Sequence, residues 1–345
     1  MATLPQNLKR NPLTDYLSGQ GLKLTTQGKV RDTWFLDESK LLFVATDRIS
    51  IFDSVLNASV PKKGEVLTAL THFWLTKVMP EVPCHLIYSK IKRGANGAYD
   101  LKRSNFPELP LERCLLVKNM QGKIFPFEMI YRGCIGGSVW STYQETGTAG
   151  GHVLPQGLTK WSKLDPALFT PSTKEEVGHD INVNAQYYYQ EMGNIGRETE
   201  TLSAYAYESA YEYAIKKGIM ILDTKFEVAP NMIVDEVLTP DSSRFSTEED
   251  WKKAIEEKRD PIFYDKQIVR DWGEKVPTPF TDNEGETIIG IKKLKPGNPE
   301  HLAFIHGLIV PEEIIAETTK RYLTIFEWLT GVPLETYQKE EMYVF

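Results

Sequence analysis

The clearest pattern in the chain is an apolar segment, residues 218–228, that carries a charged side chain at every second position near its end. Successive side chains of a β-strand point to opposite faces, so Asp223, Lys225 and Glu227 would share one face of such a strand. A strand with three charged groups on one face is not buried on both sides. The pattern therefore predicts a strand that lines a polar site.

A second strand-like segment, residues 232–238, follows after only three residues. If residues 229–231 form a three-residue hairpin loop, Lys225 lies opposite Asp235, and three carboxylates line one surface. Magnesium prefers oxygen ligands and often takes one or two carboxylates together with water and phosphate oxygens. The alternative is the solvated outer face of an antiparallel hairpin, which is the commoner position for alternating charges. We favour a site for Mg2+ and a polyphosphate, because the neighbouring residues are apolar and a serine-rich loop with an arginine follows.

Before residue 123, short apolar runs alternate with turns, which predicts a mainly antiparallel sheet with little helix. The predicted strands are 29–36, 40–46, 85–91 and 113–118, and one helix is predicted after Gly64.

The residue composition and the predicted elements change from residue 126 onward. A segment rich in Gly, Pro and Thr, residues 132–183, precedes a predicted helix at 201–217, which Gly218 would end in the left-handed conformation. A second helix is predicted after Pro311, with an apolar stripe facing the core and Gly331 at its end. The polar segment 282–300 is predicted to be a surface insertion without chemistry. These elements predict an α+β protein of two domains: a mainly β domain over residues 1–123 and a larger α/β domain over 124–345.

Composition narrows the class of protein. With 41% hydrophobic and 25% charged residues among 345, the chain is an ordinary globular protein. A net charge of -7 argues against a general nucleic-acid binder, because binding phosphate backbones needs a basic surface. The chain has no long apolar run and no leader-like start, so we expect no membrane partner and a cytoplasmic location. Three distant cysteines indicate reduced thiols.

An early glycine with two cations is a candidate phosphate site. Gly28 precedes Lys29 and Arg31, which would point the same way on a strand, and a glycine leaves room for a phosphate near the backbone. A Lys-x-Arg pair on an exposed strand is more often simply solvated, and no Walker-type motif accompanies it.

Other polar clusters could bind small anions. Arg48 and Ser50 follow an apolar run, where a turn is as plausible as a substrate loop. Arg132 lies just before a glycine-rich turn that ends in Ser138, and a guanidinium matches carboxylate and phosphate groups. The long segment beyond this turn adds the polar residues Lys174, His179 and Asp180.

Taken together, these segments resemble the phosphoribosylaminoimidazole-succinocarboxamide synthase (SAICAR synthetase) family of purine biosynthesis. The resemblance extends from residue 28 to residue 272 and is carried, in order, by GKVRDTW, ATDRISIFD, PKKGEVLTALTHFW, PFEMIYRGCIGGSVW, LPQGL, FTPSTK, GHDINV, LDTKFEV, VDEVLTPDSSRF and YDKQIVRDW. The chain departs from the usual family pattern at Tyr131, Gly136, Val228 and Ala229, whereas all the charged positions are retained.

The resemblance implies a SAICAR synthase-like fold with an ATP and substrate cleft between the two domains. It also implies an ATP-dependent ligation. ATP phosphorylates the carboxylate of carboxyaminoimidazole ribonucleotide (CAIR), and the amine of L-aspartate then displaces phosphate to form the amide of SAICAR. The partners are therefore small molecules, and the chain is expected to be a monomer or a small homo-oligomer.

The resemblance also implies residue roles. ATP would be bound by Gly28, Lys29 and Arg31, and Glu227 and Asp235 would hold Mg2+ with the ATP. Substrate contacts would come from Arg48, Ser50, Arg132, Ser138, Asp241, Ser243 and Arg244. The catalytic positions would be Asp223, Lys225, Lys174, His179 and Asp180. His179 could deprotonate the aspartate amine, although a histidine beside an aspartate is more often a structural pair.

Two alternatives remain at this point. The same machinery could serve another ATP-dependent enzyme, such as a small-molecule kinase, or a regulatory protein that binds ATP without turnover. A dependence on aspartate would separate the ligase from the kinase, and product formation would exclude the regulatory protein.

Overall fold

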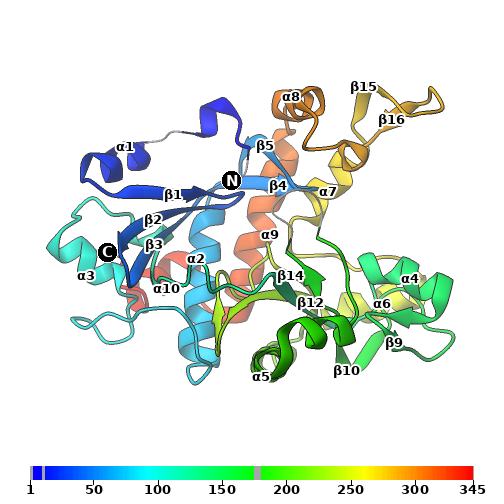
Figure 1. Ribbon diagram of the computed structural model, residues 1–345, viewed down its shortest axis with the longest axis horizontal. Helices are drawn as coiled ribbons and strands as arrows, with labels where there is room; N and C mark the ends of the chain where they lie inside the picture. Colours follow the sequence, from blue (N-terminus) through cyan, green and yellow to red (C-terminus); the bar gives the residue numbers. More distant parts are fainter. Residues whose placement is uncertain (1–2, 10–11, 175–179, 345) are drawn as a thin grey trace.

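The computed structural model describes residues 3–9, 12–174 and 180–344. The first part of the chain forms an antiparallel sheet with the strand order β1-β2-β3-β6. Its strands are β1 Lys23–Gln27, β2 Arg31–Asp37, β3 Lys40–Ala45 and β6 Cys114–Lys118. A separate hairpin, β4 (Arg48–Ile51) with β5 (Ser54–Ser59), lies beside this sheet in Figure 1. The mainly antiparallel N-terminal sheet predicted from the sequence is confirmed.

A second antiparallel sheet carries the charged strand. β12 (Ile219–Ala229) pairs along one edge with β7 (Phe127–Cys134) and along the other with β14 (Ser243–Thr247) and β13 (Met232–Val234). β10 (Lys163–Phe169) and β11 (Ser172–Thr173) extend the sheet beyond β7. The long helix α5 (Ala185–Ile215) packs on this sheet, interrupted by non-helical backbone at Gly193. Strands and helices thus combine in the α+β fold expected from the sequence.

Two helices run side by side through the middle of the molecule (Figure 1). α2 (Lys63–Phe73) is buried along its whole length. α9 (Glu312–Thr330) buries the predicted apolar stripe, including Tyr322, and Gly331 closes it with a φ of 81°. α10 (Leu334–Glu340) packs against both helices.

Shorter elements complete the fold. The remaining helices are α1 Pro12–Gly19, α3 Ala98–Ser104, α4 Ser138–Thr146, α6 Glu248–Glu257, α7 Gln267–Gly273 and α8 Pro299–Gly307. The remaining strands are β8 Thr148–Ala149, β9 His152–Val153, β15 Pro277–Thr281 and β16 Thr287–Ile289. Single turns of other helix types are Gln6–Leu8, Trp74–Val78, Leu111–Arg113 and Ile291–Lys293. None of the helices within the described ranges is long and apolar enough to span a membrane.

Several element predictions are corrected by the structure. The predicted strand at 85–91 forms only isolated bridges, at Leu86 with Val117 of β6 and at Tyr88 with Asn96. The helix predicted at 201–217 begins much earlier, at Ala185. Gly218 does follow it with a φ of 73°, as predicted. The segment 282–300 is not merely a surface insertion, since Ile291 and Leu294 are buried in a core shared with β4 and β5.

The loop between β12 and β13 contains two residues rather than three. Ala229 pairs with Met232 and Glu227 with Val234, which shifts the register by one position from the predicted pairing. Asp235 then leaves the ladder with a φ of 65°. The prediction that Lys225 lies opposite Asp235 is therefore wrong.

One apolar core joins the two predicted domains. It contains Trp34 and Leu42 of the first sheet, Met129 and Phe226 of the second, and residues of the central helices. Burial of apolar surface is the dominant favourable contribution to folding, so these parts stabilise one another. The boundary between residues 123 and 124 stays a prediction.

The buried His72 gives a test of this packing. Its ring nitrogens lie 2.9 Å from Tyr337 Oη and 2.9 Å from Gly94 O, so it links α2 to α10. Burial lowers its pKa from 6.5 to about 4. Between these values the unfolded chain binds a proton that the folded chain does not, so the free energy of unfolding falls as the pH falls from 6.5 to about 4.

We expect His72→Gln to lose part of that pH dependence, on the order of 2–3 kcal/mol between pH 6.5 and 4. Part remains, because burial also lowers the pKa of His85 to about 4. Urea unfolding at several pH values measures the effect, with the exposed His152→Gln as control. If the free energy of unfolding of His72→Gln changed with pH as steeply as that of the wild type, this account would be wrong.

Candidate active site

A cavity of about 230 Å³ opens along the polar face of β12. Its wall combines residues of β7, β12 and β14 with residues near α7 and one from the start of α4: Ile130, Arg132, Ser138, Asp223, Thr224, Lys225, Asp241, Ser242, Ser243, Arg244, Asp265 and Arg270. The strand predicted to line a polar site does line one.

The pairing of three strands sets the centre of this cavity. Asp223 of β12 is directly opposite Arg132 of β7 on one side and Arg244 of β14 on the other. Asp223 Oδ2 lies 3.1 Å from Arg132 Nη1 and 2.5 Å from Arg244 Nη1. One buried carboxylate therefore orients two guanidinium groups toward the same space.

Further contacts fix the first of these arginines. Arg132 Nε donates to Thr170 Oγ1 at 2.9 Å, and Nη2 donates to Ser138 Oγ at 3.2 Å. Burial lowers the pKa of Arg132, and Arg244 lowers it further, whereas Asp223 raises it. A buried guanidinium that is destabilised by a second cation gains from an anionic ligand.

A third arginine and a second carboxylate complete the charged wall. Burial and the nearby Arg244 lower the pKa of Arg270, while Asp265 and Asp223 raise it. Burial raises the pKa of Asp265, against the opposing effect of Arg270 and Arg244. Three arginines face two carboxylates in this part of the wall, so the cavity is suited to a phosphate or carboxylate group.

A tight turn at residues 239–242 places further polar side chains at the cavity wall. Thr239 Oγ1 accepts from Asp241 N at 3.2 Å, and Ser242 Oγ accepts from Thr239 N at 3.1 Å. Hydrogen bonds from serine and threonine side chains to nearby backbone groups are typical of such turns. Residues 241–244 consequently all reach the cavity wall.

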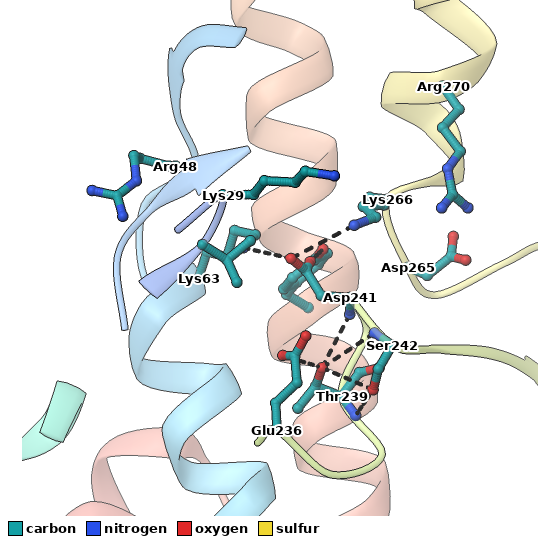
Figure 2. A network of polar contacts seen from close by, with 12 residues as sticks. Lys29, Arg48, Lys63, Glu236, Thr239, Asp241, Ser242, Asp265, Lys266 and Arg270 are labelled. Carbon is teal, nitrogen blue, oxygen red and sulfur yellow. Dashed lines mark hydrogen bonds and ion pairs between the residues drawn. The ribbon is translucent and has the colours of Figure 1, made fainter. Parts of the chain in front are cut away.

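Asp241 is the centre of a polar network from three elements (Figure 2). Its Oδ2 lies 2.8 Å from Lys63 Nζ of α2 and 3.7 Å from Lys266 Nζ, just before α7. Its Oδ1 accepts from Tyr322 Oη of α9. Burial opposes ionisation of Asp241, yet Lys266 and Lys63 hold its pKa well below the usual range. Burial lowers the pKa of Lys266 to about 8, against the effect of Asp241.

Glu227 and Asp235, the predicted metal ligands, are each held by a cation. Asp235 Oδ1 lies 2.5 Å from Arg31 Nη2, and Glu227 Oε2 pairs with Lys174 Nζ. Burial raises the pKa of Glu227 to about 7, and the negative charge of Asp235 adds to this effect. Two carboxylates that repel each other in a buried place are a chemically reasonable pair of Mg2+ ligands.

Lys225 has a different partner from the one predicted. Its Nζ lies 2.6 Å from Glu128 Oε1 on β7, because Glu128 and Lys225 belong to neighbouring paired strands. The one-residue shift of the β12–β13 hairpin removes Asp235 from its reach in the ladder. Although burial opposes it, Glu128 keeps the pKa of Lys225 above its ordinary value.

The predicted site residues from the N-terminal part lie at the turn between β1 and β2 and on β4. Lys29 Nζ pairs with Asp53 at 2.6 Å and is partly exposed, while Gly28 N donates to Arg31 O at 2.7 Å. Arg48 is buried, donates to Asp32 Oδ1 and Gly28 O, and points away from Asp241 in Figure 2. Arg48 and the buried Ser50 of β4 are thus placed outside the wall of the cavity.

Most of the other predicted residues lie in or near the cavity. Asp223, Lys225, Arg132, Ser138, Asp241, Ser243 and Arg244 line the cavity. Glu227, Asp235, Arg31 and Lys174 lie together beside it through their ion pairs. Asp180 lies close enough to raise the pKa of Lys225, whereas His179 is outside the described residues.

The predicted site lacks four charged residues of the network: Glu236, Asp265, Lys266 and Arg270. All four stand in motifs that carry the family resemblance, Glu236 in VDEVLTPDSSRF and the others in YDKQIVRDW, and this could have singled them out. From the sequence, Lys63 is compatible with either a cationic turn or a ligand contact, because adjacent lysines before a helix are common at exposed turns.

Comparisons with known proteins show the family of the chain. A model of the family described as SAICAR synthetase matches residues 24–286. The phosphoribosylaminoimidazole-succinocarboxamide synthase of Thermodesulfovibrio yellowstonii is 39% identical over 90% of this chain and 97% of its own length. The synthase of the same name from Saccharomyces cerevisiae is 36% identical over 90% of this chain and 95% of its own.

Solved structures give the same result. The SAICAR synthase of Saccharomyces cerevisiae, complexed with SAICAR, superposes with a TM-score of 0.71 at 34% identity, covering 92% of this chain and 97% of the other. A SAICAR synthetase in complex with ADP, at 18% identity and a TM-score of 0.56 over 89% of this chain and 98% of the other, shares the fold.

The arginine-rich wall predicts binding of phosphate monoesters. We expect Arg270→Met to weaken ribose 5-phosphate about tenfold or more, because a hydrogen bond to a charged group contributes roughly 1.5–3 kcal/mol. Calorimetric titration measures the Kd. Arg259→Met is the matched control, since Arg259 pairs with Asp250 and Glu257 away from the cavity. Equal affinity in both variants would exclude Arg270 from anion binding.

Proposed function

Because the chain belongs to the SAICAR synthetase family, the ATP-dependent ligases of purine biosynthesis, we propose that it joins L-aspartate to CAIR in the cavity around Asp223. The observation that carries this assignment is the pair Arg132 and Arg244, held by one buried carboxylate and facing one space. CAIR carries a phosphate and a carboxylate, so it matches a pocket rich in arginine. We place the reaction in the cytoplasm.

The ribonucleotide phosphate is assigned to the arginine wall. Arg132, Ser138 and Arg244 bind this phosphate, with Arg270 beside them. The turn at residues 241–244 supplies further contacts through Asp241 and Ser243. This orientation directs the imidazole carboxylate along β12 toward Lys225 and the Glu227 side.

ATP is assigned to the junction between the first sheet and the end of β12. Lys29 and Arg31 bind its phosphates, and the backbone at Gly28 allows close approach. Glu227 and Asp235 would hold Mg2+, which neutralises phosphate charge when bound. Arg31 and Lys174 now pair with these carboxylates. Once Mg2+ binds the carboxylates, Arg31 would be free to turn to phosphate oxygens and Lys174 to turn to the aspartate.

The ligation itself proceeds in two steps. A carboxylate oxygen of CAIR attacks the terminal phosphorus of ATP, and ADP leaves with the electrons of the broken bond. The aspartate amine then attacks the resulting acyl phosphate, loses a proton and expels inorganic phosphate. Lys225 lies beside the reacting carboxylate, and its positive charge stabilises the charge that develops there. Lys174, His179 and Asp180 bind the aspartate.

Product analysis tests the whole assignment. Purified protein is incubated with ATP, Mg2+, CAIR and L-aspartate, each omitted in turn, while ADP release and product mass are measured. We expect ADP release to need CAIR and the succinocarboxamide to form only with all four. ADP release with CAIR but without aspartate, and no amide, would instead indicate a kinase. A folded protein that binds ATP without turnover would indicate a regulatory role.

The metal assignment gives a sharper prediction. Asp235→Asn removes one proposed ligand charge and should lower kcat by roughly 10²–10³, the scale seen for single preorganised electrostatic contacts. Asp37→Asn is the control, because Asp37 pairs with Lys40 at the exposed turn between β2 and β3. Rates are measured over a range of Mg2+ concentrations. Near-normal turnover of Asp235→Asn at low Mg2+ would remove Asp235 from the site.

A further inference from the structure

Lys63 is the most deeply buried cation of the cavity region, with no exposed surface. Its side chain enters from α2 and meets the carboxylate of Asp241 at 2.8 Å, as Figure 2 shows. Burying an ammonium group is costly unless it is paired. A residue of the first predicted domain thus contacts the site assigned to CAIR, whose wall comes from residues 130–270.

The backbone around Lys63 is fixed independently of the cavity. Gly64 N donates to Asp47 Oδ1 at 2.9 Å, and Asp47 in turn pairs with Arg113. A Cβ at position 64 would lie 2.8 Å from Ala45 O, so the start of α2 is pressed against the end of β3. Lys63 therefore projects from the start of α2, where that helix is anchored against the end of β3.

The carboxylate of Asp241, which Lys63 contacts, has partners from three parts of the chain. Tyr322 of α9 donates to Oδ1, while Lys63 and Lys266 face Oδ2. An ionised carboxylate has about four acceptor positions, so Asp241 keeps capacity for a donor of the ligand in the cavity. These partners hold the side chain of Asp241, and its backbone is held by the hydrogen bond from Asp241 N to Thr239 Oγ1.

We propose that Lys63 is a positioning residue for the ribonucleotide: it acts through Asp241, fixing the acceptor oxygen of that carboxylate at the cavity wall. The proposal rests on the assignment of CAIR to this cavity. Loss of Lys63 leaves Lys266 as the remaining cation at Oδ2 and lets the carboxylate turn toward it, so the ribonucleotide loses a preorganised contact. The ATP phosphates and the aspartate are assigned to other residues and keep their affinity.

The test compares Lys63→Met, Asp241→Asn and the double variant by steady-state kinetics and by calorimetric titration with SAICAR. Lys63→Met should raise the KM for CAIR and the Kd for SAICAR about tenfold, with the KM for ATP and aspartate within about twofold. The double variant should be no weaker than Asp241→Asn alone, because Lys63 acts through that carboxylate. Lys62→Met, an adjacent exposed lysine that pairs with Glu65, is the control and should match the wild type.

Equal increases in all three KM values, or full additivity in the double variant, would overturn the proposal and leave Lys63 a structural residue. If Asp241→Asn itself leaves the KM for CAIR unchanged, the assignment of CAIR contacts fails instead. Should Lys63→Met not fold, as judged by circular dichroism, Tyr322→Phe removes a second contact to the same carboxylate without burying a charge. It should raise the KM for CAIR about threefold and leave that for ATP unchanged, and an equal change in both would also overturn the proposal.

Discussion

The pairing of β12 with both β7 and β14 is the constraint on which the site depends. It places Asp223 directly between Arg132 and Arg244, so that one carboxylate partly neutralises two guanidinium groups that would otherwise repel each other. A shift of one residue in either ladder would turn one arginine to the opposite face of the sheet. The hydrogen bonds of the sheet thus determine where an anion can bind.

Ion pairs of the same kind continue along β12 and just past the end of β13. Lys225 is paired with Glu128, Glu227 with Lys174, and Asp235 with Arg31. Each of these charges has a counterion within the protein, which limits the cost of desolvation before ligands bind. Anionic substrates and a divalent cation can then exchange partners with these groups, so binding requires rearrangement of ion pairs rather than burial of new, uncompensated charge.

The parts of the chain that supply these charges are distant in the sequence but share one core. The first sheet contributes Arg31, and α2 contributes Lys63, whereas the second sheet carries Asp235 and the turn with Asp241. Packing of α2 against α9 brings Lys63 and Tyr322 to the same carboxylate. The wall of the cavity comes from the second predicted domain alone, but ion pairs from Arg31 and Lys63 reach its surroundings across the predicted boundary at residue 123. The geometry of these pairs depends on how the two sheets pack against the central helices.

The sequence determined much of the chemistry, because local patterns are set by local physics. Alternation along residues 218–228 indicated a strand with a polar face, and Gly218 and Gly331 marked helix ends through their freedom to adopt positive φ. The sequence motifs indicated the family, and the family implied the α+β fold. Which charged side chains pair with one another was decided only by the tertiary structure. A two-residue loop instead of three gave Lys225 a different counterion, and Lys63 joined the site only because α2 packs against α9 and the turn at Asp241. Such contacts join residues far apart in the chain, and they depend on strand register and helix packing, which periodicity in one segment does not specify.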